Sequence, residues 1–124
     1  MATPAEYTTL FPYLFVDGAK DYIDFLIHGL GADELGRTIR DDRAIANCRL
    51  KFGNTTIMVS EAEKRYPPSR CSLYLYVDDA EASVRRAIEH GATLEMPLAD
   101  MDYGDRQGGI MDPNGNIWWI SQRL

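Results

Sequence analysis

The two halves of the chain resemble each other. Residues Tyr13–Ala19 read YLFVDGA, and residues Tyr74–Ala80 read YLYVDDA, at an offset of 61 positions in a chain of 124. In both halves this segment leads into a stretch with helical spacing and then a glycine–alanine pair, Gly31-Ala32 and Gly91-Ala92. Two copies indicate a duplicated two-module fold, because a solenoid needs at least about three repeats.

Each half is predicted to contain the same elements in the order βαβββ. Alternating apolar and polar residues predict strands, and apolar residues spaced three and four apart predict helices. We expect Asp78 to cap the second helix. The expected first half has strands at 11–16, 33–40, 43–52 and 55–60 and a helix near 18–29; the second has strands at 72–77, 93–97, 107–111 and 117–122 and a helix near 79–90.

The length and composition fit one globular domain. The chain has 124 residues, of which 45% are hydrophobic and 26% are charged, close to the average of soluble domains. We therefore predict a single domain over 1–124. Module one spans about 9–60, a charged linker with Pro67-Pro68 spans about 61–70, and module two spans about 71–123.

Charge and hydropathy exclude several classes of protein. The formal net charge of −6 lacks the basic surface of nucleic-acid-binding proteins. No apolar run approaches the ~18 residues of a membrane span, and the first residues have no pattern of a secretion signal. We therefore expect a cytoplasmic protein. The negative charge either favours a cationic partner or only serves solubility.

The first strand of each half has an unusual second face. Leu14 and Val16 lie on the face expected to pack on a helix, while the opposite face is aromatic and polar. Buried hydroxyl groups need hydrogen-bond partners, so a face that lines a cavity explains this pattern better than an ordinary core. The residues of the second face are Phe11, Tyr13, Phe15, Ser72, Tyr74 and Tyr76.

The segment Tyr103–Ile120, YGDRQGGIMDPNGNIWWI, is the most specific motif. Together with the βαβββ repeat it resembles the vicinal oxygen chelate superfamily, which includes glyoxalase I, extradiol dioxygenases and bleomycin resistance proteins. The resemblance covers about Phe11 to Gln122. It implies an α+β fold in which tandem βαβββ modules form a half-barrel cup around a ligand. In small members the two modules of one cup often come from different chains, so the resemblance also implies a homodimer.

The metal-binding members of this superfamily carry His, Gln or Glu at four positions. By the resemblance, the first-strand positions fall on Phe11 and Ser72 or, with a shift of two, on Tyr13 and Tyr74. The last-strand positions fall on Trp119 and on either Met58 or Ser60, and none of these residues is a histidine or a carboxylate. The histidines of the chain, His28 and His90, are expected at helix ends. We therefore expect no metal and no cofactor.

Aromatic residues at these positions imply a different use of the cup. Aromatic faces stack on planar heterocycles and attract cations, so the chain is similar to the bleomycin resistance branch, which binds an antibiotic without converting it. The leading hypothesis is a metal-free protein that sequesters an aromatic or cationic small molecule. The predicted ligand-binding residues are Phe11, Tyr13, Phe15, Ser72, Tyr74, Tyr76, Tyr103, Arg106 and Trp119.

Other interpretations stay open. The aromatic residues also suit a plain core. A glyoxalase-like lyase or dioxygenase with a divalent metal or atypical catalytic residues is the alternative function, although no catalytic residue stands out. A dimeric regulatory protein with a vestigial cup is a third. Arg106 either contacts a ligand carboxylate or phosphate or belongs to a local Asp–Arg pair that holds the hairpin.

Overall fold

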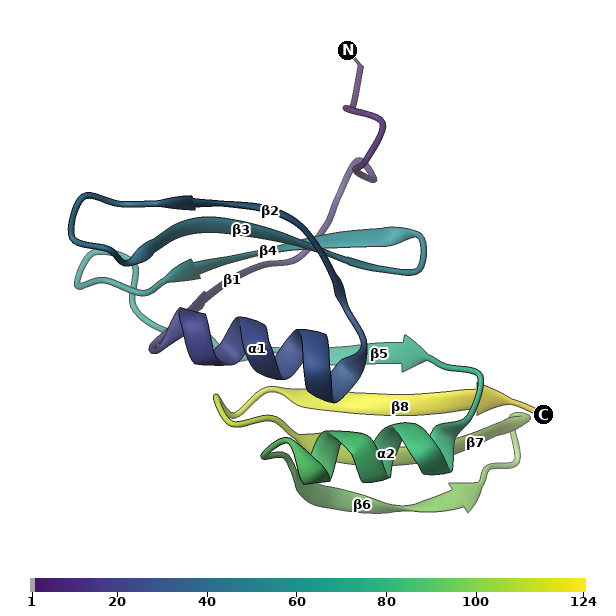
Figure 1. The fold of residues 1–124 in the computed structure, drawn as a ribbon. Helices are drawn as coiled ribbons and strands as arrows, with labels where there is room; N and C mark the ends of the chain where they lie inside the picture. Colours follow the sequence, from purple (N-terminus) through teal and green to yellow (C-terminus); the bar gives the residue numbers. More distant parts are fainter. Residues whose placement is uncertain (1) are drawn as a thin grey trace. The chain divides into compact units, whose positions relative to one another are not determined.

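The computed structural model describes residues 2–124 and contains the βαβββ arrangement twice (Figure 1). The predicted α+β class and element order are confirmed. The first half contains β1 (Tyr13–Val16), α1 (Ala19–Leu30), β2 (Asp33–Ile39), β3 (Ile45–Phe52) and β4 (Thr55–Glu61). The second half contains β5 (Ser72–Tyr76), α2 (Ala80–Glu89), β6 (Thr93–Asp100), β7 (Asp105–Met111) and β8 (Ile117–Arg123).

The described residues separate into two compact units. Unit 1 comprises residues 2–27 and 31–69, and unit 2 comprises residues 28–30 and 70–124. Each unit contains one four-stranded sheet, with the strand order β1-β4-β3-β2 in unit 1 and β5-β8-β7-β6 in unit 2. The duplication seen in the sequence is therefore a duplication of sheet topology.

The first strand of each unit pairs in parallel with the last strand of the same unit. Tyr13 lies beside Met58 in the β1–β4 pair, and Tyr74 lies beside Trp119 in the β5–β8 pair. All other strand pairs are antiparallel. Parallel neighbours need a long crossover connection, which here consists of the helix and the two remaining strands.

One face of each sheet contributes to the core, as the alternation predicts. Leu14 and Val16 of β1 are buried, whereas Tyr13 is 44% exposed. In unit 2, α2 packs against β6, β7 and β8 and buries Val84, and Ile120 of β8 is also buried. Within the described residues, no helix is long and apolar enough to cross a membrane.

Helix α1 obtains its amino-terminal cap from a distant strand. Its N-cap residue is Gly18, which has a left-handed backbone (φ 71°) and no side chain to accept a hydrogen bond. The Glu61 carboxylate of β4 replaces it, because its two oxygens accept from the backbone N–H groups of Gly18 (3.0 Å) and Ala19 (2.9 Å). This contact stabilises the exposed N–H groups and the positive end of the helix dipole.

Helix α2 is capped by Asp79 and not by Asp78, so the predicted cap was wrong by one residue. The Asp79 side chain accepts from the Ala82 N–H (3.0 Å). Gln122 of β8 accepts from the Ala80 N–H (3.0 Å). Gln122 therefore does for α2 what Glu61 does for α1, at the same offset along the chain.

The turn between β7 and β8 is organised by a buried carboxylate. Asp112 accepts hydrogen bonds from the backbone N–H groups of Asn114 (2.9 Å) and Asn116 (3.0 Å) and from the Trp118 indole (2.9 Å). Short polar residues are typical of such turns because they bind backbone groups two residues on. The DPNGN motif thus has a structural role.

Both cysteines are free thiols. Cys48 is buried in β3, and Cys71 is half-buried just before β5. Burial raises the pKa of the Cys48 thiol to about 11, so it is un-ionised at neutral pH.

Glu61→Ala is expected to lower the free energy of unfolding by about 1 kcal/mol, because the variant leaves two N–H groups of α1 without their partner. Glu61→Gln is the matched control and should lose less, since Gln122 performs this task in unit 2. Urea titration followed by circular dichroism measures both. Equal losses in the two variants, or no loss in Glu61→Ala, contradict the capping role.

Candidate functional site

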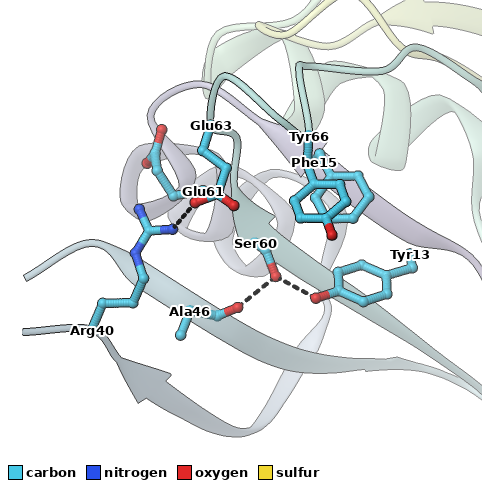
Figure 2. Close-up of a pocket in the computed structure, with 8 residues that line it drawn as sticks. All are labelled: Tyr13, Phe15, Arg40, Ala46, Ser60, Glu61, Glu63 and Tyr66. Atoms are coloured by element: carbon cyan, nitrogen blue, oxygen red, sulfur yellow. Dashed lines mark hydrogen bonds and ion pairs between the residues drawn. The ribbon is translucent and has the colours of Figure 1, made fainter.

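Unit 1 contains a pocket of about 360 Å³ on the aromatic face of its sheet (Figure 2). The face is the one that the alternation in β1 predicts to line a cavity. The pocket combines aromatic rings on one side with charged side chains on the other (Figure 2). Its lining residues are Tyr13, Phe15, Arg40, Ala46, Ser60, Glu61, Glu63 and Tyr66.

The aromatic side of the pocket is a stack of three rings. Phe15 lies between Tyr13 and Tyr66, with ring centroids 4.8 Å and 5.7 Å away. The Tyr13 hydroxyl is 2.8 Å from the Ser60 hydroxyl, and Ser60 donates its own hydrogen to the Ala46 carbonyl at 2.6 Å. Because a serine has a single hydroxyl hydrogen, Tyr13 is the donor in the Tyr13–Ser60 bond.

The other side of the pocket is charged. Arg40 donates to the Glu63 carboxylate at 3.1 Å, and the Glu61 carboxylate binds the start of α1. Two carboxylates and one guanidinium give the lining a net negative charge, which favours a cation over an anion.

Phe11 lies outside this group. It precedes β1, and its ring stacks on Tyr7 with centroids 4.9 Å apart. It is not among the residues that line the unit 1 pocket. Of the three aromatic residues predicted in this half, the structure thus brings Tyr13 and Phe15 together.

In unit 2 the two tyrosines of β5 share one acceptor. The Tyr74 and Tyr76 hydroxyls donate to the same oxygen, Oδ2 of Asp105, at 2.6 Å and 2.8 Å. Their rings lie 5.3 Å apart with a 55° tilt, and the two side chains are 49% and 57% exposed. The hydroxyl ends are therefore held while much of each ring faces outward.

Asp105 is the polar centre of this face. It is 1% exposed, and its other carboxylate oxygen accepts from Arg123 at 3.0 Å. The hydrogen bond from Tyr74 holds the pKa of the Asp105 carboxyl below its usual range, with further lowering by Tyr76 and Arg123. The same bond raises the pKa of the Tyr74 phenol. At neutral pH, Asp105 is thus an anion and Tyr74 keeps its proton.

A second chain of hydrogen bonds holds Tyr103. Its hydroxyl donates to Oε1 of Gln107, and the Gln107 amide donates to the Ser121 hydroxyl at 3.0 Å. Gln107 and Ser121 are buried cross-strand partners in β7 and β8. Tyr103 itself is 53% exposed. Its hydroxyl group is therefore held by a hydrogen bond while much of the side chain is exposed to solvent.

Trp119 lies on the same face as Tyr74, which is its partner in the parallel pair. Its indole N–H donates to the Ser72 hydroxyl at 2.7 Å. Opposite Trp119 in β7 is Gly109. A Cβ on this glycine would lie 2.8 Å from the indole ring, so the absence of a side chain leaves the ring room to lie close to the strand.

Arg106 lies apart from these residues. It precedes Gln107 in β7 and so points to the opposite face of the sheet. There it forms a two-bond pair with Asp100 of β6, at 2.7 Å and 3.2 Å, and lines a hollow with Glu81 of α2. Its pairing agrees with the alternative of a hairpin-holding Asp–Arg pair, with Asp100 as the partner.

Several residues of the two faces were not among those predicted. Continued alternation from Trp119 points to Ser121, and the repeat offset relates Ser121 to Ser60, so both had a signal in the sequence. Asp105 belongs to the YGDR segment, but the sequence does not show that two tyrosines of another strand donate to it. Tyr66 lies in the predicted linker, where no periodicity exists.

The residues at the superfamily's metal positions do not fit a divalent ion. Ser72 and Trp119 are hydrogen-bonded to each other through the indole N–H, and an indole N–H is a donor without a lone pair for a metal. Phe11 has no donor atom at all. Among residues 2–124, no three His, Cys, Asp or Glu side chains gather as metal ligands would.

Solved structures share this fold. TioX from Micromonospora sp. ML1 superimposes with a TM-score of 0.77 at 22% identity, covering 94% of this chain and 97% of that chain. TnmS3, an antibiotic binding protein from Streptomyces sp. CB03234, superimposes with a TM-score of 0.74 at 21% identity, covering 99% and 98%. These likenesses define the class as a small tandem βαβββ protein.

The chain belongs to the Glyoxalase/Bleomycin resistance protein/Dioxygenase superfamily, whose family model matches residues 7–120. The resemblance found in the sequence is therefore confirmed. A sequence relative is the uncharacterized protein Mb0911c of Mycobacterium bovis, which is 32% identical over 91% of this chain and 82% of its own length.

The Asp105 carboxylate makes the stability of the protein depend on pH. Its pKa is lowered in the folded state, so its contribution is complete above the unfolded value of about 3.9 and is lost as the pH falls through the folded value. Urea titrations at about pH 5 and about pH 2.5 should therefore show a larger loss for the wild type than for Asp105→Asn. Equal losses contradict the role assigned to this carboxylate.

Proposed function

We propose that this protein binds an aromatic or cationic small molecule without converting it, in the manner of the bleomycin resistance proteins. One observation carries the proposal. Tyrosine side chains on the helix-free sheet faces are tied at their hydroxyl groups to the protein's own polar atoms, and their rings remain exposed.

Fixed rings suit binding because the ligand does not have to order them. Immobilising a flexible side chain on binding costs roughly 0.5–1.5 kcal/mol, and a tyrosine that is already hydrogen-bonded avoids much of that cost. The Tyr13–Phe15 and Tyr74–Tyr76 pairs present ring faces of this kind. Such faces stack on planar rings and attract cations.

The charge of the molecule supports the same ligand class. The chain has a formal net charge of −6, and the unit 1 pocket has more carboxylates than guanidinium groups. Among the proteins of the same fold, TnmS3 is described as an antibiotic binding protein. This supports sequestration as the proposed activity. We also propose a second copy of the chain as the partner, as the resemblance to the small members of the superfamily implies.

Trp119→Ala is expected to weaken the binding of planar cations such as 9-aminoacridine by at least about tenfold, as loss of a central aromatic contact does. Isothermal titration calorimetry measures the affinity, and tryptophan emission is a second readout. Ile88→Ala is the matched control, because Ile88 is an exposed apolar residue of α2. Equal affinities in wild type, variant and control contradict a site at Trp119.

Elemental mass spectrometry tests the competing enzymatic function. Protein purified without chelators or a histidine tag is expected to contain no stoichiometric Zn, Ni, Fe, Mn or Mg, because the donor atoms at the family's metal positions do not suit these ions. About one tightly held ion per chain contradicts the proposal and favours a lyase or dioxygenase, to be assayed next.

A further inference from the structure

Arg123 is a cation on the aromatic sheet face of unit 2. It is the cross-strand partner of Asp105, and alternation along β8 places it on the same face as Trp119 and Ser121. Its side chain is 66% exposed, although the carboxylate to which it is bound is buried. An exposed guanidinium is therefore present on the face that also carries the exposed tyrosine rings.

The protein itself uses only part of this guanidinium. Nη1 of Arg123 donates to the Tyr103 carbonyl oxygen and to Oδ1 of Asp105, at 3.0 Å in both cases. Hydrogen bonds to Asp105 and, more weakly, to Tyr76 raise the pKa of Arg123, so the group stays charged. Because a guanidinium has five N–H donors, these three acceptors leave about two of them for a ligand.

The position of the guanidinium depends on Gly104. This glycine has a φ of 95°, and a Cβ on it would lie 3.1 to 3.2 Å from Cζ, Nη1 and Nη2 of Arg123. Such similar distances to three atoms of one planar group mean that the guanidinium lies flat over the glycine. A ligand therefore does not have to order this side chain, which lowers the cost of binding.

The charges around Arg123 favour an uncharged acceptor over an anion. Asp105 is ionised and offsets the charge of the guanidinium, and the chain has a formal net charge of −6. A ligand carboxylate would add a further negative charge close to Asp105. A carbonyl oxygen accepts a charge-assisted hydrogen bond from the guanidinium without that repulsion.

We propose that Arg123 recognises a carbonyl oxygen on a planar aromatic ligand, such as an aromatic ketone or amide, whose rings lie against the aromatic side chains of unit 2. This inference rests on the proposed function and narrows it. The rings supply contact area for any planar compound, whereas the remaining N–H groups of Arg123 select compounds that present an acceptor oxygen.

Three probes with one ring system separate the carbonyl group from shape and charge. 10-Methylacridone is an uncharged ketone, 10-methylacridinium is a cation of the same shape without an oxygen, and acridine-9-carboxylate is an anion. Isothermal titration calorimetry on the full chain measures their affinities. The wild type is expected to bind 10-methylacridone more tightly than acridine-9-carboxylate.

Arg123→Lys keeps the charge and removes the spare donors. A lysine has three N–H donors, which suffice only for the three acceptors that the protein supplies. The variant should therefore bind 10-methylacridone about tenfold more weakly, as expected for loss of a hydrogen bond to a charged group. Its affinity for 10-methylacridinium should not change, because neither the rings nor the charge is altered.

Arg106→Lys is the matched control, because Arg106 forms its two-bond pair with Asp100 on the opposite face of the same sheet. Its affinities for both probes should equal those of the wild type. Gly104→Ala is a second, independent variant, because it keeps Arg123 and displaces the guanidinium. It should weaken the binding of 10-methylacridone alone. Circular dichroism establishes that each variant is folded.

The outcomes separate this inference from the proposed function. If Arg123→Lys weakens both probes equally, or neither, Arg123 does not recognise the carbonyl group and binding by the aromatic faces stands. Wild-type binding of 10-methylacridinium without 10-methylacridone overturns the inference in the same way. If acridine-9-carboxylate binds as tightly as the ketone, the uncharged acceptor is wrong. If none of the three probes binds, the proposed function fails together with the inference.

Discussion

The parallel pairing of the first and last strands is the constraint on which each unit depends. Hydrogen bonds between β1 and β4, and between β5 and β8, join segments that are far apart in the chain. This closure places Tyr13 and Phe15 beside Ser60, and Tyr74 beside Trp119. The same register carries Glu61 and Gln122 to the starts of the helices. The aromatic faces and the helix caps therefore both depend on this parallel pairing, which occurs once in each unit.

The polar atoms on these faces are compatible with stability because the protein satisfies them itself. Among the described residues, every buried side-chain nitrogen or oxygen has a hydrogen-bond partner. A buried carboxylate such as Asp105 is costly unless it is paired and hydrogen-bonded, and here two phenols and a guanidinium surround it. On this face, exposed tyrosine rings are therefore attached to a buried carboxylate that is fully hydrogen-bonded.

Much of the fold was predictable because its signals are local. The repeat, the alternation in β1 and β5 and the DPNGN turn predicted the elements with boundaries close to those observed. The candidate site was harder to predict from the sequence, because it depends on the register in which the strands pair. Asp105 becomes central only when β7 is aligned against β8 and β5, and the opposite orientation of Arg106 follows from that same alignment. Tyr66 joins Phe15 through a segment without periodicity, which no pattern could have indicated.

The lack of a side chain at Gly109 determines where the Trp119 ring lies. The indole of Trp119 lies where a side chain on the neighbouring strand would be, so the height of the ring above the sheet depends on a single position. A methyl group there would lie 2.8 Å from the indole, so the ring would have to move away from the strand. Under the proposed function, the space that this face offers a ligand can therefore change by one substitution at Gly109.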